Sequence, residues 1–114
     1  MLARYLRVLA ERDGASLVHC FAGKDRTGIA ATLLLHVLGV SERDQMTEFL
    51  RTNAAPTYAV LYGQSVPGIE AKLGRKLDKE GARALLEVHE DYLLRFREAV
   101  IALDGSLDGW LAAR

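Results

Sequence analysis

Hydrophobic positions recur at helical spacing at the start of the chain. They are Leu2, Tyr5, Leu6 and Leu9. Such spacing places them on one face of a helix, so we predict an amphipathic helix over residues 2 to 12, ended by the turn pair Asp13 and Gly14. Residues 15 to 20 (ASLVHC) then form a short apolar run before a glycine-bearing loop, which predicts a buried strand.

The stretch from Thr27 to Leu38 is apolar on nearly every face, which predicts a helix packed on all sides. Gly39 stands where a left-handed C-terminal cap is expected. Ser41, with Asp44 three residues on, resembles a capping box and predicts a helix through about residue 52.

The second half predicts helices separated by a broken segment. Prolines and glycines interrupt residues 53 to 77, which favours a loop with a short helix near residues 70 to 76 and makes Tyr58 to Tyr62 a poor second strand. Asp78 caps a long predicted helix to about Leu103. We expect Gly105 to end that helix and Ser106 to cap a final turn or two.

Only residues 15 to 20 make a convincing strand, and a lone strand leaves its backbone donors and acceptors unpaired. The sequence therefore predicts an α/β fold with an incomplete sheet, in which one strand leads into a loop and mostly helices follow. We expect residues 1 to 114 to form a single, partial domain. A second copy, in a homo-oligomer, or a complementing fragment would complete the sheet.

Composition and charge exclude some kinds of binding partner. Of the 114 residues, 50% are hydrophobic and 26% are charged, as in an ordinary globular domain. The 15 basic and 15 acidic residues cancel, so we expect no nucleic-acid partner. Charges throughout residues 1 to 14 argue against a signal peptide there. No apolar run approaches the roughly 18 residues of a membrane span, so we expect no stable membrane insertion.

Cys20 is the single cysteine and cannot form an internal disulfide. This favours a reducing compartment, so we predict a cytoplasmic location and leave open secretion without a classical signal peptide. No pair of CxxC motifs offers a zinc site, and we expect no metal and no other cofactor. A buried structural thiol is the simplest alternative use of a lone cysteine.

Arg26 follows Cys20 after five intervening residues and lies at the expected start of a helix. A strand, a glycine-bearing loop and a helix N-terminus together bind anions, because backbone N–H groups point inward and the helix dipole adds positive charge. An arginine can hold two oxygens of one phosphate. The pKa of a thiol in such a site falls to roughly 3.5–7.5, and the thiolate can attack phosphorus.

The residues HCFAGKDRTG resemble the signature HCxxGxxRTG of the cysteine-dependent protein tyrosine phosphatases. The GKDRTG ending is most similar to atypical bacterial phosphatases that act on phosphotyrosine, phosphoserine or phosphothreonine, and phosphoinositides. The later stretches TEFLRTN and VHEDYLLRFREAVIALDGSLDGWL also resemble the helical C-terminal half of that family. The resemblance covers most of the chain from Ala15 onward.

The resemblance implies a role for each residue of the loop. Cys20 would be the nucleophile that forms a cysteinyl-phosphate. Arg26 and the loop amides would bind the phosphoryl oxygens and stabilise the transition state without a metal. The loop residues are Phe21, Ala22, Gly23, Lys24, Asp25 and Arg26.

Three polar neighbours would assist. His19 would orient the loop and help to lower the pKa of the cysteine without transferring protons. Thr27 would donate its hydroxyl to the thiolate and ease its departure when water cleaves the intermediate. Lys24, unless simply solvated, would add positive charge over the pocket, which in this family goes with acceptance of phosphoinositides. The expected partner is therefore a phosphorylated protein or a phosphoinositide substrate.

The general acid has two candidates. Family members carry much of their sheet, and commonly an acidic loop, before the signature, whereas only 18 residues precede His19. Asp13 is the sole aspartate among them and is expected at the far end of the strand from the loop. Asp25 lies within reach of a leaving oxygen and has this duty in relatives with the same ending; otherwise it only fixes the loop through hydrogen bonds.

Two functions from different classes remain open. The first is a phosphomonoesterase; the second is a phosphatase remnant that binds oxyanions or a phosphorylated partner but turns over little. Cys-x5-Arg also occurs in arsenate reductases and rhodanese-like folds, but the His-Cys start and Arg-Thr-Gly finish favour the phosphatase. Other side chains have structural interpretations: Asn53 as a helix-end residue, and His36 and His89 as satisfied or solvated. Tyr58 and Tyr62 are interpreted as packing aromatics, with the lining of a substrate entrance as the alternative.

Overall fold

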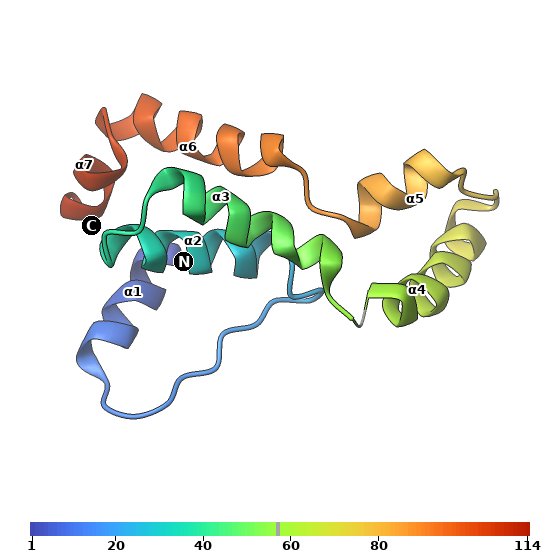
Figure 1. Cartoon of the computed structure of the whole chain (residues 1–114), viewed down its shortest axis with the longest axis horizontal. Coiled ribbons are helices and arrows are strands. Elements are labelled where there is room, and N and C mark those ends of the chain that lie inside the picture. Colours follow the sequence, from blue (N-terminus) through green and yellow to red (C-terminus); the bar gives the residue numbers. More distant parts are fainter. Residues whose placement is uncertain (57) are drawn as a thin grey trace.

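The computed structural model describes residues 1–56 and 58–114, and of Tyr58 it describes only the backbone. These residues form helices and no strand (Figure 1). The helices are α1 (Leu2–Glu11), α2 (Asp25–Val37), α3 (Glu42–Leu50), the 3-10 helix η1 (Arg51–Ala54), α4 (Tyr58–Leu73), α5 (Lys79–Leu86), α6 (Glu90–Asp104) and α7 (Leu107–Ala112).

The helices α2, α3 and α6 contact one another and form the body of the molecule. Helix α1 packs on α2, and α7 packs on α6 near the two termini (Figure 1). Helices α4 and α5 are set off at the opposite end. The loop that precedes α2 lies on the side of the body that faces α4 and α5 (Figure 1).

Two clusters of buried side chains make the core. The first contains Leu33, Val100 and Trp110, and the second contains Phe49, Val88 and Leu93. Phe96 of α6 packs against both clusters and so joins them. Because Val88 precedes α6, the second cluster anchors the α5–α6 connector beside α3.

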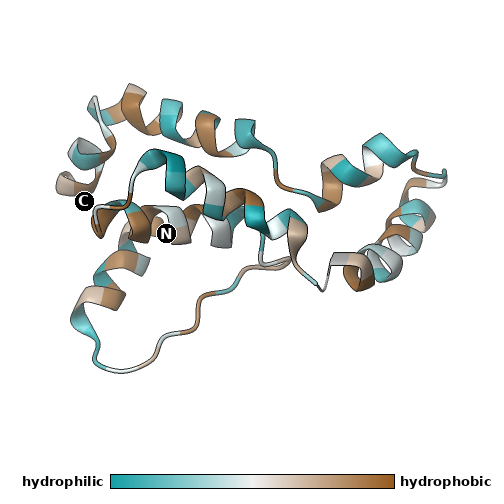
Figure 2. Cartoon of the chain, in the orientation of Figure 1, coloured by the Kyte–Doolittle hydropathy of each residue, from teal (hydrophilic) through white to brown (hydrophobic). Residues whose placement is uncertain are grey.

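The predicted strand over residues 15 to 20, and with it the α/β class, is wrong. These residues form an irregular segment, and Leu17 is 89% exposed. Figure 2 shows that this segment carries apolar residues although it lies apart from the helix core. A strand exists only where a neighbour pairs with its backbone, and no other strand occurs in the part of the chain that is described.

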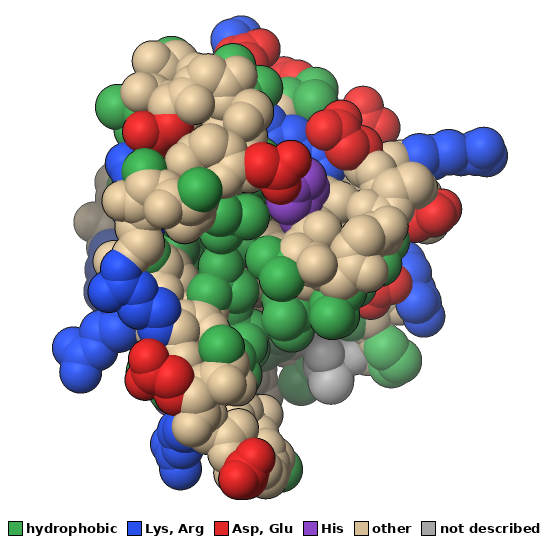
Figure 3. Space-filling model, turned by 90° about the vertical axis from the view of Figure 1, so that its left-hand side faces the viewer, with side chains coloured by type: hydrophobic (Ala, Val, Ile, Leu, Met, Phe, Trp, Pro, Cys, Tyr) green, Lys and Arg blue, Asp and Glu red, His purple; other side chains and the backbone are tan. Residues whose placement is uncertain are grey.

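The helix α2 begins two residues earlier than predicted and is not packed on all sides. Ala30, Thr32 and Leu33 are buried, whereas Val37 is 58% exposed. Tyr5, Val18, Leu34 and Leu35 help to line a hollow of about 560 Å³ between α1, the irregular segment and α2. At the end of the molecule near the termini, hydrophobic side chains also lie open in a hollow surrounded by polar groups (Figure 3).

The molecule is correspondingly open. Its radius of gyration is 16.2 Å, against about 13 Å for a compact domain of this length. Completion of the fold by a second copy or another fragment stays a prediction, as does the single, partial domain. Among residues 1–56 and 58–114, no helix has both the length and the apolar character needed to cross a bilayer.

Two predictions in the second half are corrected. Residues 58–73 are helical, so the strand over Tyr58 to Tyr62 is absent, and the short helix predicted near residues 70 to 76 is the end of a longer one. The long helix after Asp78 is divided into α5 and α6, because Glu87 adopts an extended conformation and His89 caps α6, its Nδ1 accepting from the Asp91 amide at 3.4 Å.

The predicted caps are confirmed. Ser41, Asp78 and Ser106 each accept a hydrogen bond from the backbone amide three residues on, at 3.1, 2.7 and 2.9 Å. Gly39 and Gly105 follow helix ends with φ of +79° and +77°, in the left-handed region that favours glycine.

Candidate active site

The loop that carries the single cysteine ends at the N-terminus of α2. The first helical hydrogen bond of α2 runs from the Gly28 amide to the Lys24 carbonyl, at 2.8 Å. The amides of Asp25, Arg26 and Thr27 come before that bond and have no helical acceptor. The Thr27 amide acts on the Cys20 sulfur, and those of Asp25 and Arg26 are available to an anion. Gly23 has φ of +70°, a left-handed turn that favours glycine, and its amide donates to the Cys20 sulfur at 3.2 Å.

Cys20 is partly buried, and the pKa of its thiol is lowered from 9.0 to about 6. The side-chain hydroxyl of Thr27 is the largest cause, and the amides of Thr27, Gly23 and Ala22 lower the pKa further, while burial opposes them. Thr27 Oγ1 is buried, and among the described residues no partner lies in full hydrogen-bond geometry with it. With a pKa of about 6, the sulfur is mostly a thiolate at neutral pH.

We expect alkylation of the chain by iodoacetamide to have its pH midpoint near 6, because the thiolate is the reacting form and Cys20 is the only thiol. Thr27→Val removes the hydroxyl and should move the midpoint up towards 9.0. The urea-unfolded chain, in which the loop donors are lost, is the control and should also titrate near the ordinary value. A wild-type midpoint equal to that of the unfolded chain would show that the loop does not stabilise the thiolate.

His19 and Arg26 lie on either side of the loop and are both exposed. The His19 ring lies 3.3 Å from the Cys20 carbonyl oxygen, which accepts the hydrogen bond, and it is not among the groups that lower the cysteine pKa. Arg26 is the second residue of α2, and its guanidinium has no hydrogen bond or ion pair with the described residues. Its donors are therefore free for an oxyanion.

Lys24 and Asp25 interact with each other. The Lys24 ammonium lies 3.0 Å from the Asp25 carboxylate and also donates to the Glu87 carbonyl at 3.1 Å. Lys24 is thus not the simply solvated lysine of the alternative interpretation: it ties the loop to the α5–α6 connector. Asp25 is the first residue of α2 and its side chain is 46% exposed, so its carboxylate is accessible from solvent. Asp13 lies just after α1, at the other end of the irregular segment from Cys20.

Asn53 holds the same connector from the other side. Its side-chain amide donates to the Val88 carbonyl at 2.9 Å and its carbonyl accepts from the Val88 amide at 2.8 Å. Asn53 is therefore a bridge between η1 and the connector rather than only a helix-end residue. Its partner lies 35 positions along the chain, and no local sequence pattern indicates such a pairing.

Gly28, the last residue of the motif, has a packing role. A Cβ built at this position would lie 2.8 Å from the ring of Phe49, which is too close for any side chain. The absence of a side chain lets α3 approach α2 directly behind the loop. Phe49 is buried, so this contact connects the loop to the second core cluster.

His36 and His89 are structural, as predicted. His36 Nε2 lies 2.8 Å from the Asp108 carboxylate, and His89 is exposed as the cap of α6.

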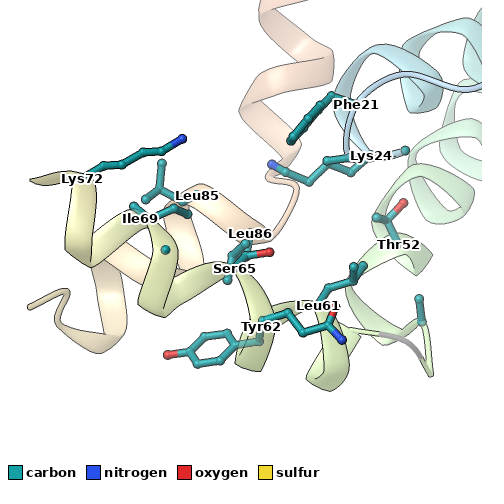
Figure 4. A pocket seen from close by; sticks show the side chains of 15 residues that line it. Phe21, Lys24, Thr52, Leu61, Tyr62, Ser65, Ile69, Lys72, Leu85 and Leu86 are labelled. Atoms are coloured by element: carbon teal, nitrogen blue, oxygen red, sulfur yellow. The ribbon is translucent and has the colours of Figure 1, made fainter.

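A cavity of about 630 Å³ adjoins the loop. Phe21, Ala22, Gly23 and Lys24 form one wall, and α4 and α5 form the opposite one (Figure 4). Tyr62 belongs to the lining, whereas the side chain of Tyr58 lies outside what the structure describes. An anion held by the loop amides would therefore lie beside a largely apolar space.

The loop thus joins a thiol of lowered pKa to helix N-terminal amides and to an arginine without a partner among the described residues, a combination of groups suited to an oxyanion. The whole chain, residues 1–114, matches the sequence model of the tyrosine phosphatase family. The chain belongs to that family.

Curated relatives agree. The chain is 39% identical over 95 residues to a protein of Cupriavidus necator that carries the name of a tyrosine-protein phosphatase, and 31% identical over 111 residues to the triple specificity protein phosphatase PtpB of Mycobacterium tuberculosis. Each match covers 83% of this chain, but only 33% and 37% of these relatives. A tyrosine-protein phosphatase of Nostoc commune is 55% identical over 40 residues, 35% of this chain and 14% of that protein. The chain thus spans about a third of the length of the first two relatives.

Proposed function

We propose that this chain bears the nucleophile and phosphate-binding loop of a phosphatase that hydrolyses phosphomonoesters, phosphotyrosine first, through a cysteinyl-phosphate. The observation that carries the proposal is the lowered pKa of Cys20, whose sulfur lies among backbone amides of the loop, in a chain of the tyrosine phosphatase family. The words "triple specificity" in the name of the M. tuberculosis relative support more than one class of substrate, with phosphoserine, phosphothreonine and phosphoinositides as further candidates.

The proposed reaction has two steps. The Cys20 thiolate attacks phosphorus, an S–P bond forms as the ester P–O bond breaks, and the leaving oxygen takes a proton from the Asp25 carboxyl group. Water then attacks phosphorus and gives its proton to the Asp25 carboxylate, while the S–P bond breaks and the thiolate is restored. The products are the free alcohol or phenol and inorganic phosphate.

We assign the surrounding residues the roles that the family resemblance implies. Arg26 and the loop amides stabilise the charge that spreads over the equatorial oxygens. Thr27 donates its hydroxyl to the departing thiolate in the second step. Through its bond to the Cys20 carbonyl, His19 orients the loop backbone.

The same features also support a second candidate, a module that binds a phosphorylated partner without turnover, because the loop amides and the guanidinium bind phosphate whether or not an acid is present. We further propose that a second copy of the chain or a complementing fragment covers residues 15 to 20, where Leu17 is 89% exposed. A lone thiolate keeps its reactivity best in a reducing compartment, which supports a cytoplasmic location.

Two substrates that differ in leaving group test the function. We expect the wild-type chain to hydrolyse both p-nitrophenyl phosphate and a phosphotyrosine peptide. Asp25→Asn should slow the peptide by at least about 10²-fold and the nitrophenyl ester far less, because nitrophenolate leaves without a proton. Release of inorganic phosphate is the measurement.

The control is Asp44→Asn, which changes an aspartate at the start of α3 and should leave both rates unchanged. Equal slowing of both substrates in Asp25→Asn would remove Asp25 from the role of acid. Binding of phosphate with hydrolysis of neither substrate by the wild-type chain would favour the binding module.

A further inference from the structure

The charges around the cavity beside the loop have one sign. Of the residues that line it, only Lys24 and Lys72 are charged, and both are cationic. The Lys24 ammonium is already paired with the Asp25 carboxylate at 3.0 Å. Lys72, near the C-terminal end of α4, has no ion pair or hydrogen bond with the described residues. It is therefore the cation of this cavity that is left for a ligand.

Lys72 lies on the wall of the cavity opposite the loop. Figure 4 shows its side chain extending from α4 above Ile69 and Leu85, on the side of the cavity that faces Phe21. Phe21 is 98% exposed, so its ring is available to a ligand at the edge of the loop. A ligand that places its phosphoryl group in the loop and extends to the Lys72 ammonium would therefore contact apolar side chains between these two points.

The size and the walls of the cavity fit a peptide with an aromatic residue. Its volume of about 630 Å³ lies within the range of sites that enclose small ligands, and its lining includes the aliphatic side chains of Leu61, Ile69, Leu85 and Leu86. A tyrosine ring gains from such a surface, whereas phosphoserine has no ring to bury. An acidic residue next to the phosphotyrosine would complement the Lys72 charge.

We propose, resting on the function proposed above, that this cavity binds the residues flanking phosphotyrosine in a substrate peptide, and that Lys72 selects peptides with an acidic side chain there. Lys72 is thus a specificity-determining residue supplied by α4. The ion pair forms at an exposed edge, so its effect is moderate and depends on salt.

The test compares kcat/KM for two phosphotyrosine peptides that differ only in carrying glutamate or glutamine beside the phosphotyrosine. We expect the wild-type chain to favour the glutamate peptide by about fivefold at low salt, with the preference shrinking as salt is added. Lys72→Gln should abolish the preference, and Lys72→Glu should reverse it. The matched control is Arg75→Glu, which makes the same change of charge at a residue outside this cavity and should keep the wild-type preference.

The outcomes separate this inference from the proposed function. If the wild-type chain does not hydrolyse p-nitrophenyl phosphate, the proposed function fails. If it hydrolyses that ester but treats the two peptides alike, or if Arg75→Glu changes the preference as much as Lys72→Glu does, the inference about Lys72 fails. Hydrolysis of a phosphoinositide in vesicles that depends on Lys72, without any peptide preference, would assign the cavity to a lipid headgroup and would also overturn the inference.

Discussion

We expect Cys20→Ser to abolish hydrolysis of every phosphomonoester that the wild-type chain accepts, with a loss of at least about 10⁴-fold, as removal of a nucleophile causes elsewhere. The serine hydroxyl is not ionised near neutral pH, whereas the pKa of the Cys20 thiol is lowered to about 6. The chain has no second cysteine that could replace it. The measurement is release of inorganic phosphate under single-turnover conditions.

The same variant should still bind phosphate. Its loop amides belong to the backbone, and loss of the thiolate removes a negative charge that repels the ligand. Titration with inorganic phosphate should therefore give an affinity at least equal to that of the wild-type chain. Turnover retained in Cys20→Ser would exclude the cysteinyl-phosphate mechanism, and loss of phosphate binding together with turnover would show that the loop had not kept its conformation.

The helix ends could be predicted because the interactions that fix them are local. Ser41, Asp78 and Ser106 bond to amides three residues away, and Gly105 adopts its left-handed turn next to the helix that it ends. Strand formation is not local, because each strand depends on a partner that the apolar run at residues 15 to 20 does not specify. The same run of hydrophobic residues is therefore irregular here.

Tertiary contacts account for the other corrections. Nothing in the periodicity after Asp78 marks Val88 as a break, yet Asn53 binds both backbone groups of Val88 from η1 and so fixes the connector that separates α5 from α6. In α4 the residues that suggested a loop, Pro67 among them, are accommodated within a helix. Propensity alone does not decide such segments.

In the candidate site, too, the local features could be predicted and the long-range contacts could not. Cys20, Gly23 and Thr27 lie close together in the sequence, so the motif predicts a lowered pKa and the part of the Thr27 hydroxyl. It did not indicate the Gly23 amide as a donor, and His19, which was expected to help, is not among the causes. The Lys24–Glu87 contact joins residues 63 positions apart and was not predicted. It adds contacts with Asp25 and with the α5–α6 connector to a lysine that also lines the cavity.

Arg26→Lys should lower kcat by at least about 10²-fold, the cost of losing one oxyanion donor in other enzymes. The guanidinium donates two parallel N–H groups to two phosphoryl oxygens. An ammonium keeps the charge but cannot bind both oxygens in this bidentate way. Arg26 is exposed and makes no ion pair or hydrogen bond with the residues described, so its replacement removes no contact that stabilises the fold. We therefore expect the thermal unfolding midpoint to stay at the wild-type value.

The measurement is kcat and KM for p-nitrophenyl phosphate in Arg26→Lys and in a matched control, Arg43→Lys, which changes an exposed arginine of α3 in the same way. Charge stabilisation in the transition state predicts that kcat falls much more than KM rises, and that the control keeps both values. If KM alone rose, Arg26 would contribute only to substrate binding. If both arginine variants lost activity equally, the effect would come from the overall charge of the chain, and the placement of Arg26 at the start of α2 would have no special part in the reaction.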